Sequence, residues 1–224
     1  MPALPAVVHP RNLISLLDFL GIGIASAGGA LHARQHLRYE YDIIGAFGLA
    51  LASGLGGGIA RDVLLQHGPP LALVNVGYLY TALGGAAIAL IFPSSFGVRM
   101  QRAMLLIDAA AISLFAVAGT TRAENFGMSW LPAILLGITT AVGGGSLRDV
   151  LSGTTPRVFE RGNFYAIAAL VAAVSYLILE RFDLSEVACV SIAVACGFAL
   201  RVASVHFNWR TDGLRSTKSS AGKL

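Results

Sequence analysis

The residues of this sequence best suited to chemistry form a glycine triplet followed by an arginine-aspartate pair, and this pattern occurs twice. The copies read Gly56-Gly57-Gly58-Ile59-Ala60-Arg61-Asp62 and Gly143-Gly144-Gly145-Ser146-Leu147-Arg148-Asp149. Each glycine weakens a helix by ~1 kcal/mol, so we expect the chain to bend or unwind at both triplets. In a membrane, a loosened backbone is tolerated where protein or water satisfies it. Its carbonyl oxygens could then coordinate a dehydrating cation along a path.

Close helix packing is the alternative interpretation of the triplets, because small residues let helix backbones approach one another. Two stripes of small residues at a spacing of four support it: Ala46, Ala50, Gly54 and Gly58, and Ser191, Ala195, Ala199 and Ala203. For the second stripe we expect packing, while for the triplets both interpretations stay open.

Charged residues beside the triplets are the second candidate group. Ionisable side chains at a membrane boundary are costly and are usually paired. The candidates are Asp18, Arg61, Asp62, Asp108, Arg148 and Asp149. We expect Asp18 and Arg61 near the outer side and Asp108 and Arg148 near the inner side, so that the two clusters lie at the two ends of one path. Alternatively, the arginines snorkel and the aspartates cap helices or stabilise the fold through buried pairs.

Hydroxyl groups near the glycines complete the candidate path. Ser53, Thr139, Thr140 and Ser146 could line it with oxygen atoms, although serine and threonine also bond back to their own helix. The five histidines show no metal-ligand spacing, and we find no nucleophile elbow, phosphate loop or cluster of metal ligands. We therefore expect neither enzymatic activity, nor a bound metal, nor a cofactor.

The elements that must position these residues are membrane-spanning helices. The chain is 55% hydrophobic and 12% charged, with a mean hydropathy of +0.71, whereas soluble domains carry roughly 25% charge. Apolar runs long enough to approach the ~20 residues of a membrane span recur along the chain, at 13–31, 41–58, 71–92, 103–121, 130–145, 164–180 and 186–206. The sequence therefore predicts an all-α integral membrane protein with seven transmembrane helices. Its net charge of +4 then reflects membrane orientation rather than binding to nucleic acid.

The distribution of lysine and arginine predicts the orientation. Alternate loops on one side hold twelve of these residues, and those on the other side hold four, Arg11, Arg61, Arg122 and Arg181. The richer side should be cytoplasmic. The N-terminus is then outside and the C-terminus inside.

An internal repeat organises the chain. Asp18 matches Asp108, and the two triplet motifs match each other, with offsets of 90 and 87 residues; Pro69 and Tyr78 likewise match Pro156 and Tyr165. Three spans in each unit force the second unit to enter the membrane from the opposite side, so the repeats are inverted, as in many proteins that pass solutes across membranes. The predicted divisions are an N-terminal segment (1–12), two three-helix repeats (13–98 and 99–184), a seventh helix (185–207) and a flexible basic tail (208–224).

From Asp18 through the seventh span, the chain resembles the prokaryotic relatives of the trimeric intracellular cation channels. The resemblance rests on the doubled GGGxxRD motif and on the three-plus-three-plus-one arrangement of helices. It implies a homotrimer in the prokaryotic plasma membrane, surrounded by lipid, with one pore per protomer between the repeats. Potassium, with sodium as a second candidate, would be the permeant ion.

The resemblance also implies roles for the motif residues. The two triplets would be kinks in the second and fifth helices, with the arginine-aspartate pairs beside them. The fourth and fifth spans lack the Lys-Glu-Val motif that animal members use in lipid binding and gating. Some relatives are described as glycine transporters, so a secondary transporter of a small zwitterion is the alternative function.

Overall fold

The computed structural model describes residues 10–36, 38–66, 68–91, 97–182 and 184–211 of the chain. These residues form helices and no strand, apart from one isolated antiparallel bridge between Asn163 and Arg210. The helices are α1 (Pro10–Gln35), α2 (Ile43–Leu65), α3 (Leu71–Val74), α4 (Val76–Ile91), α5 (Gly97–Asn125), α6 (Trp130–Leu151), α7 (Ala166–Leu179) and α8 (Glu186–His206).

Five helical segments are long and apolar enough to cross a membrane: Leu13–Gln35, Ile43–Leu65, Arg102–Asn125, Trp130–Leu151 and Glu186–His206. The helices α4 and α7 are also apolar but shorter, at 16 and 14 residues. These lengths and compositions confirm the prediction of an all-helical membrane protein.

Each predicted apolar run coincides with a helix, except that the third is divided at Asn75. The Asn75 side chain accepts a hydrogen bond from the Gly77 N–H at 2.9 Å, and its backbone N–H bonds to the Leu71 carbonyl at 2.8 Å. Asparagine competes for backbone hydrogen bonds in this way and so favours helix ends. It therefore ends α3 and begins α4.

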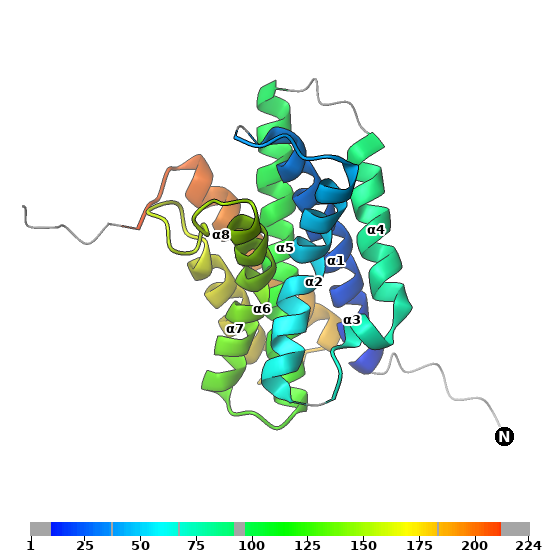
Figure 1. The fold of residues 1–224 in the computed structure, drawn as a ribbon. Coiled ribbons are helices and arrows are strands. Elements are labelled where there is room, and N and C mark those ends of the chain that lie inside the picture. The colour runs from blue at the N-terminus through cyan, green and yellow to red at the C-terminus, as the bar shows by residue number, and fades with distance from the viewer. Residues whose placement is uncertain (1–9, 37, 67, 92–96, 183, 212–224) are drawn as a thin grey trace, which may run out of the picture.

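The helices form one bundle in which the start of α1 and the end of α8 lie at opposite ends (Figure 1). In the core of the bundle, α2 packs on α1 and α6, and α5 packs on α1 and α6. On one flank, α7 and α8 pack on each other and on α5, and α4 packs on α1 at the other flank. The two triplet-bearing helices are thus central.

The first three residues of the predicted stripe on α2 pack inside the bundle, against α1, whereas Gly58 is half-buried and a Cβ atom added to it would meet no other helix. Ala46, Ala50 and Gly54 are buried. A Cβ atom added to Gly54 would collide with the Ser26 hydroxyl, and one added to Gly29 would lie 2.8 Å from the Cα atom of Ala50. Small residues from both helices therefore make this contact.

The predicted stripe on the last span is wrong within the protomer. Ser191, Ala195 and Ala199 are exposed. The buried face of α8 instead carries Ala193 and Gly197, and a Cβ atom on Gly197 would lie 2.7 Å from that of Ala172. Two parallel rows of small residues run along α8, and spacing alone does not distinguish them.

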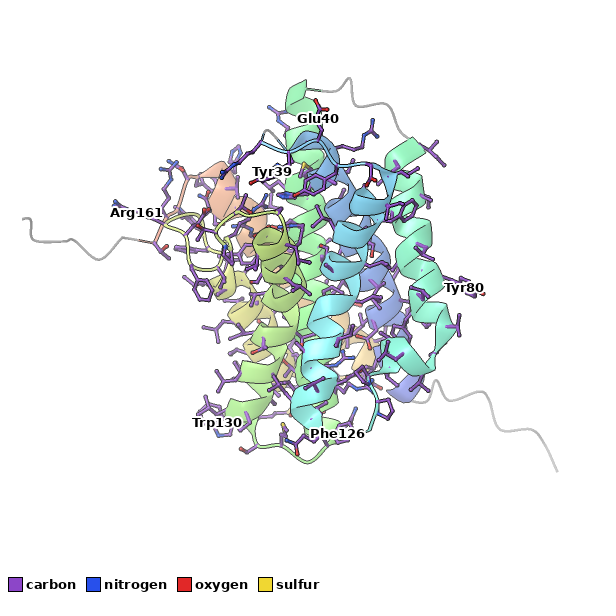
Figure 2. All side chains as sticks on the ribbon, in the orientation of Figure 1. Tyr39, Glu40, Tyr80, Phe126, Trp130 and Arg161 are labelled. Carbon is purple, nitrogen blue, oxygen red and sulfur yellow. The ribbon has the colours of Figure 1, made fainter. Side chains whose placement is uncertain are left out.

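The outside of the bundle is rich in apolar and aromatic side chains (Figure 2). Tyr80 and Trp130 project from it, and Ile43, Ile44 and Ile91 are exposed as well. Such a surface suits contact with lipid, with aromatic residues near the membrane interfaces.

The predicted terminal segments lie largely outside the described residues. The first part of the predicted flexible tail is nevertheless held in place. Asn163 donates hydrogen bonds to the carbonyls of Ser204 and Trp209 at 2.8 and 3.1 Å, and the Thr211 N–H bonds to the Gly162 carbonyl at 3.0 Å. The chain therefore remains packed on the α6–α7 segment up to residue 211.

Candidate functional site

The two glycine triplets meet where α2 and α6 cross. A Cβ atom added to Gly57 would collide with the carbonyl oxygen of Thr140, and one added to Gly144 would collide with the carbonyl oxygen of Ser53. Residue 57 thus faces residue 140 while residue 53 faces residue 144, so α2 and α6 run antiparallel with their backbones in contact. Glycine, which has no Cβ atom, permits this approach.

Neither helix is unwound at its triplet, so of the two predicted forms, a bent or an unwound backbone, the unwound one is wrong, and the bend stays a prediction. The helix α2 continues to Leu65 and α6 continues to Leu151. Gly56 and Gly143 also face the opposite helix, but a Cβ atom on Gly58 would approach only Arg61, at 3.8 Å. A close crossing requires regular helix turns on both sides, and the packing alternative therefore describes these contacts.

Two of the four hydroxyl groups near the crossing are engaged within their own helix. Thr139 and Thr140 donate to the carbonyls of Leu135 and Leu136 at 2.8 and 2.7 Å. Ser53 and Thr140 are buried, and Thr139, Ser146 and Gly145 are half-buried. The threonine oxygens retain lone pairs, so they can still accept from water or coordinate a cation.

The first charged cluster joins α1, α2 and α5. Arg61 binds both carboxylate oxygens of Asp18, at 2.8 and 3.3 Å, and its Nε donates to Asp62 at 2.9 Å. Arg122 of α5 lies 3.9 Å from Asp18 and 3.6 Å from Asp62. Two carboxylates thus face two guanidinium groups, and the cluster is electrically neutral.

The second charged cluster is arranged differently. Arg148 binds Asp149 at 2.7 Å. Asp108, which corresponds to Asp18 of the first cluster, is approached by Arg157, at 3.5 Å, and by Arg201, at 3.6 Å. Two carboxylates here face three guanidinium groups. This cluster therefore carries one excess positive charge.

The two clusters nevertheless share a hydrogen-bond pattern that follows the sequence repeat. In each cluster a tyrosine hydroxyl donates to the aspartate on the first helix of the repeat, Asp18 or Asp108. A loop N–H donates to the aspartate of the glycine motif, Asp62 or Asp149. The bonds are Tyr78 to Asp18 (3.5 Å), Tyr165 to Asp108 (3.4 Å), the Leu71 N–H to Asp62 (2.9 Å) and the Arg157 N–H to Asp149 (3.3 Å).

Three arginines of these clusters, Arg122, Arg157 and Arg201, were not among the predicted site residues. Arg201 carried a usable signal, because it is a charge within an apolar helix, and such charges generally face the protein interior. Arg157 follows Pro156 in the loop between α6 and α7, where an arginine has no distinguishing pattern. The structure brings the predicted charged residues together in two groups as expected, and adds these three.

Two small cavities accompany the clusters. One of about 10 Å³ is lined by residues that include Asp18, Arg61 and Phe115, and one of about 20 Å³ by residues that include Gly28 and Asp108. They share no lining residue, and each has room for about one water. The Phe115 ring, which lines the first cavity, lies 2.7 Å from the position that a Cβ atom on Gly21 would take.

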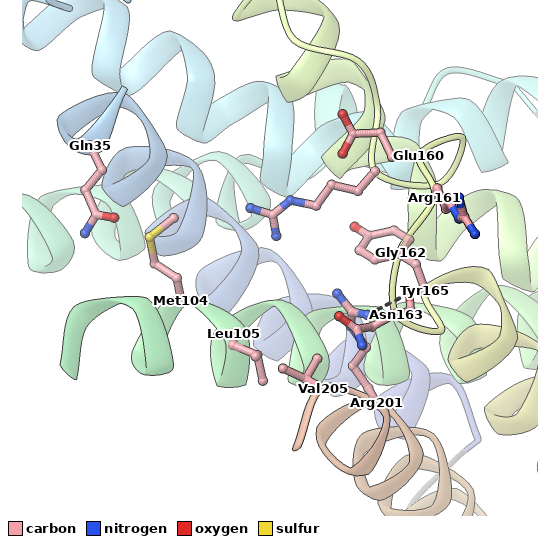
Figure 3. A pocket seen from close by; sticks show the side chains of 11 residues that line it. Gln35, Met104, Leu105, Glu160, Arg161, Gly162, Asn163, Tyr165, Arg201 and Val205 are labelled. Atoms are coloured by element: carbon pink, nitrogen blue, oxygen red, sulfur yellow. Dashed lines mark hydrogen bonds between the residues drawn. The ribbon is translucent and has the colours of Figure 1, made fainter. Parts of the chain in front are cut away.

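A much larger cavity of about 420 Å³ lies beside the second cluster. Figure 3 shows Gln35, Met104 and Leu105 on one side of it and Glu160, Arg161, Asn163 and Tyr165 on the other. Arg157 lines both this cavity and the 20 Å³ cavity in the interior. Its side chain therefore stands between the two.

Comparisons with known proteins place these features in a family. A family model described as glycine transporter matches residues 15–94 and 105–181. A UPF0126 membrane protein of Deinococcus radiodurans is 35% identical over 158 residues, which cover 70% of this chain and 72% of that protein. The UPF0126 inner membrane protein YadS of Escherichia coli is 29% identical over 163 residues, covering 72% of this chain and 76% of YadS.

Similarity extends to a solved structure. The trimeric intracellular cation (TRIC) channel orthologue from Rhodobacter sphaeroides superimposes with a TM-score of 0.76 at 35% sequence identity, covering 87% of this chain and 98% of that one. The two matched blocks of the family model contain the two copies of the glycine motif.

Proposed function

Because this chain belongs to the family whose model is described as glycine transporter and which includes the prokaryotic TRIC channels, we propose that it is a monovalent cation channel. It is a multi-pass protein of the bacterial inner membrane, as its relatives and its apolar helices indicate. Potassium is the principal permeant ion in this proposal, with sodium as a second.

The pair of charged clusters carries this proposal. Their aspartates and their motif arginines are repeat-matched, and the clusters lie toward opposite ends of the bundle because Arg61 and Arg148 follow the antiparallel crossing on α2 and α6. A path between them runs along the glycine crossing, with one path per protomer. Carboxylates attract a cation, and the neighbouring arginines limit how long it stays.

The fold that we propose for the membrane has seven crossings. The segments α3 and α4 together make the third crossing, and α7 makes the sixth, so that two inverted three-helix repeats precede α8. The N-terminus is then outside and the C-terminus inside, as the twelve-to-four charge distribution supports. Three copies assemble, as they do in the proteins named TRIC channels.

In this proposal, the present conformation is a closed state of the path. Each end cavity has room for only about one water, and Phe115 and its apolar neighbours Ile22 and Leu55 are buried at the first one. An apolar constriction without continuous water stops ions effectively. Opening must therefore widen the space around Phe115.

Recording from purified protein in planar bilayers tests the proposal. A potassium gradient should produce discrete current steps whose reversal potential follows potassium rather than chloride. Uptake of labelled glycine into liposomes, without current steps, would instead favour the transporter that the family description names. Folded, monodisperse protein that passes neither ion nor glycine would contradict both functions.

A further inference from the structure

The second charged cluster contains a carboxylate that is neutralised but poorly hydrogen-bonded. Asp108 Oδ2 is buried and has no hydrogen-bond partner, because the two guanidinium groups near it stop at 3.5 and 3.6 Å. Its counterpart Asp18 is instead gripped by Arg61 at 2.8 and 3.3 Å. A buried carboxylate oxygen without a donor is expensive, so it retains capacity to bind a positive charge.

The two arginines beside Asp108 differ in how firmly they are held. Arg201 donates to the carbonyls of Asn163 and Phe164 at 3.2 Å each, as the dashed line to Asn163 in Figure 3 indicates. It also stacks over the Tyr165 ring at 5.0 Å, and its side chain is 9% exposed. Arg201 is therefore fixed.

Arg157 is the less restrained of the two. Its side chain is 39% exposed, and its ion pair with Asp108 is its one charged contact among the described residues. It belongs to the irregular segment between α6 and α7, and it borders the 420 Å³ cavity into which it could turn. The matched position in the first repeat, one residue after Pro69, is Pro70, so the first cluster has no such side chain.

From this arrangement we infer that Asp108 is a binding site for a dehydrated monovalent cation and that the Arg157 guanidinium occupies it as a tethered cation. This inference rests on the proposed channel function. With Arg157 in place the second cluster has three arginines against Asp108 and Asp149, a net charge of +1 that repels permeant cations. When Arg157 turns into the large cavity, the cluster becomes neutral like the first one, and Asp108 and the Tyr165 hydroxyl offer oxygen ligands to the entering ion.

Potassium flux into proteoliposomes tests the inference through four variants compared with the wild type. Arg157→Gln, which removes the charge at similar length, should raise the flux on the order of tenfold, as expected for one unit charge a few ångströms from an ion path. Arg157→Lys should remain near wild type. Arg161→Ala, the matched control, removes a charge from the same segment and cavity and should also remain near wild type. Adding Asp108→Asn to Arg157→Gln should lower the flux again, because the anionic ligand is lost.

The possible results separate the inference from the channel function itself. A wild type that conducts, with Arg157→Gln conducting equally, would overturn the tethered-cation role while leaving the channel in place. An equal increase of the potassium flux in Arg161→Ala would show that the effect comes from general surface charge, and it would also overturn the tethered-cation role of Arg157. If every variant is silent although melting temperature and elution volume match the wild type, the channel function fails, and the inference fails with it.

Discussion

At the scale of single residues, the two charged clusters show how the same residue types serve different ends. Arg61 and Asp18 are each about 2% exposed and make a two-point ion pair, so they lock α1 to α2. Arg122 is 20% exposed and stays beyond hydrogen-bond distance, at 3.6 and 3.9 Å. Removing one partner of a buried ion pair leaves an uncompensated charge, whereas a more exposed pair contributes little.

This difference predicts unequal costs for neutralising the two arginines. We expect Arg61→Gln to lower the free energy of unfolding by about 3–5 kcal/mol and Arg122→Gln to lower it by about 1 kcal/mol or less. Unfolding in mixed micelles of increasing denaturing detergent measures both. Equal losses would show that Arg122 is as tightly coupled to Asp18 and Asp62 as Arg61 is.

At the scale of the elements, the crossing of α2 and α6 explains the doubled glycine motif. A regular helix needs glycine only at positions that face a neighbouring backbone, and Gly57 and Gly144 face one at a distance that excludes a Cβ atom. Gly58 faces no backbone within 4 Å. The same sequence triplet therefore holds positions with opposite tolerance to alanine.

Alanine substitution should reveal that contrast. Gly57→Ala should lower the free energy of unfolding by about 1–3 kcal/mol through overpacking. Its neighbour Gly58→Ala should be neutral or gain up to ~1 kcal/mol of helix propensity. Thermal melting in mild detergent checks both variants. Full stability of Gly57→Ala, with reduced potassium flux, would favour a kinked helix lining the path over a packing contact.

At the scale of the whole molecule, each half of the chain contributes a side chain to the cluster of the other half. Arg122 of α5 reaches Asp18 and Asp62. His32 of α1, which matches Arg122 in the repeat at an offset of 90 residues, lies 3.1 Å from the hydroxyl of Ser152, the residue after α6. Together with the α2–α6 crossing, these contacts interlock the halves. The two repeats should therefore fold and unfold as one unit.

The proposed orientation predicts which loops are accessible from outside the cell. In a background with Cys189 and Cys196 replaced by serine, Asn125→Cys should react with a membrane-impermeant maleimide in intact cells. Thr155→Cys should react only after the membrane is opened, because the proposed orientation puts it at the opposite, cytoplasmic end of the bundle. Labelling of Thr155→Cys in intact cells would reverse the orientation.

The class of the protein, the positions of its helices and the doubling of its motif could all be predicted from the sequence. The length of an apolar run and the spacing of a repeat are properties of the chain alone, so the runs at 13–31 and 130–145 marked α1 and α6, and Asp18 and Asp108 were recognised as a pair. The sequence did not predict that α2 and α6 continue beyond their arginine-aspartate pairs, because the charged residues end the apolar runs by which the helices were located.

The contacts that the matched residues make could not be predicted from the sequence, because they depend on how the helices pack. The partners of Asp108, Arg157 and Arg201, lie 49 and 93 positions away, on a loop and on α8, and no local pattern encodes such a contact. The buried face of α8 was decided in the same way, because Gly197 and Ala195 are both small, and the neighbours of Gly197, which include Ala172, distinguish them. Distance between helices, which the sequence does not contain, determines whether a small or charged residue packs, pairs or faces the lipid.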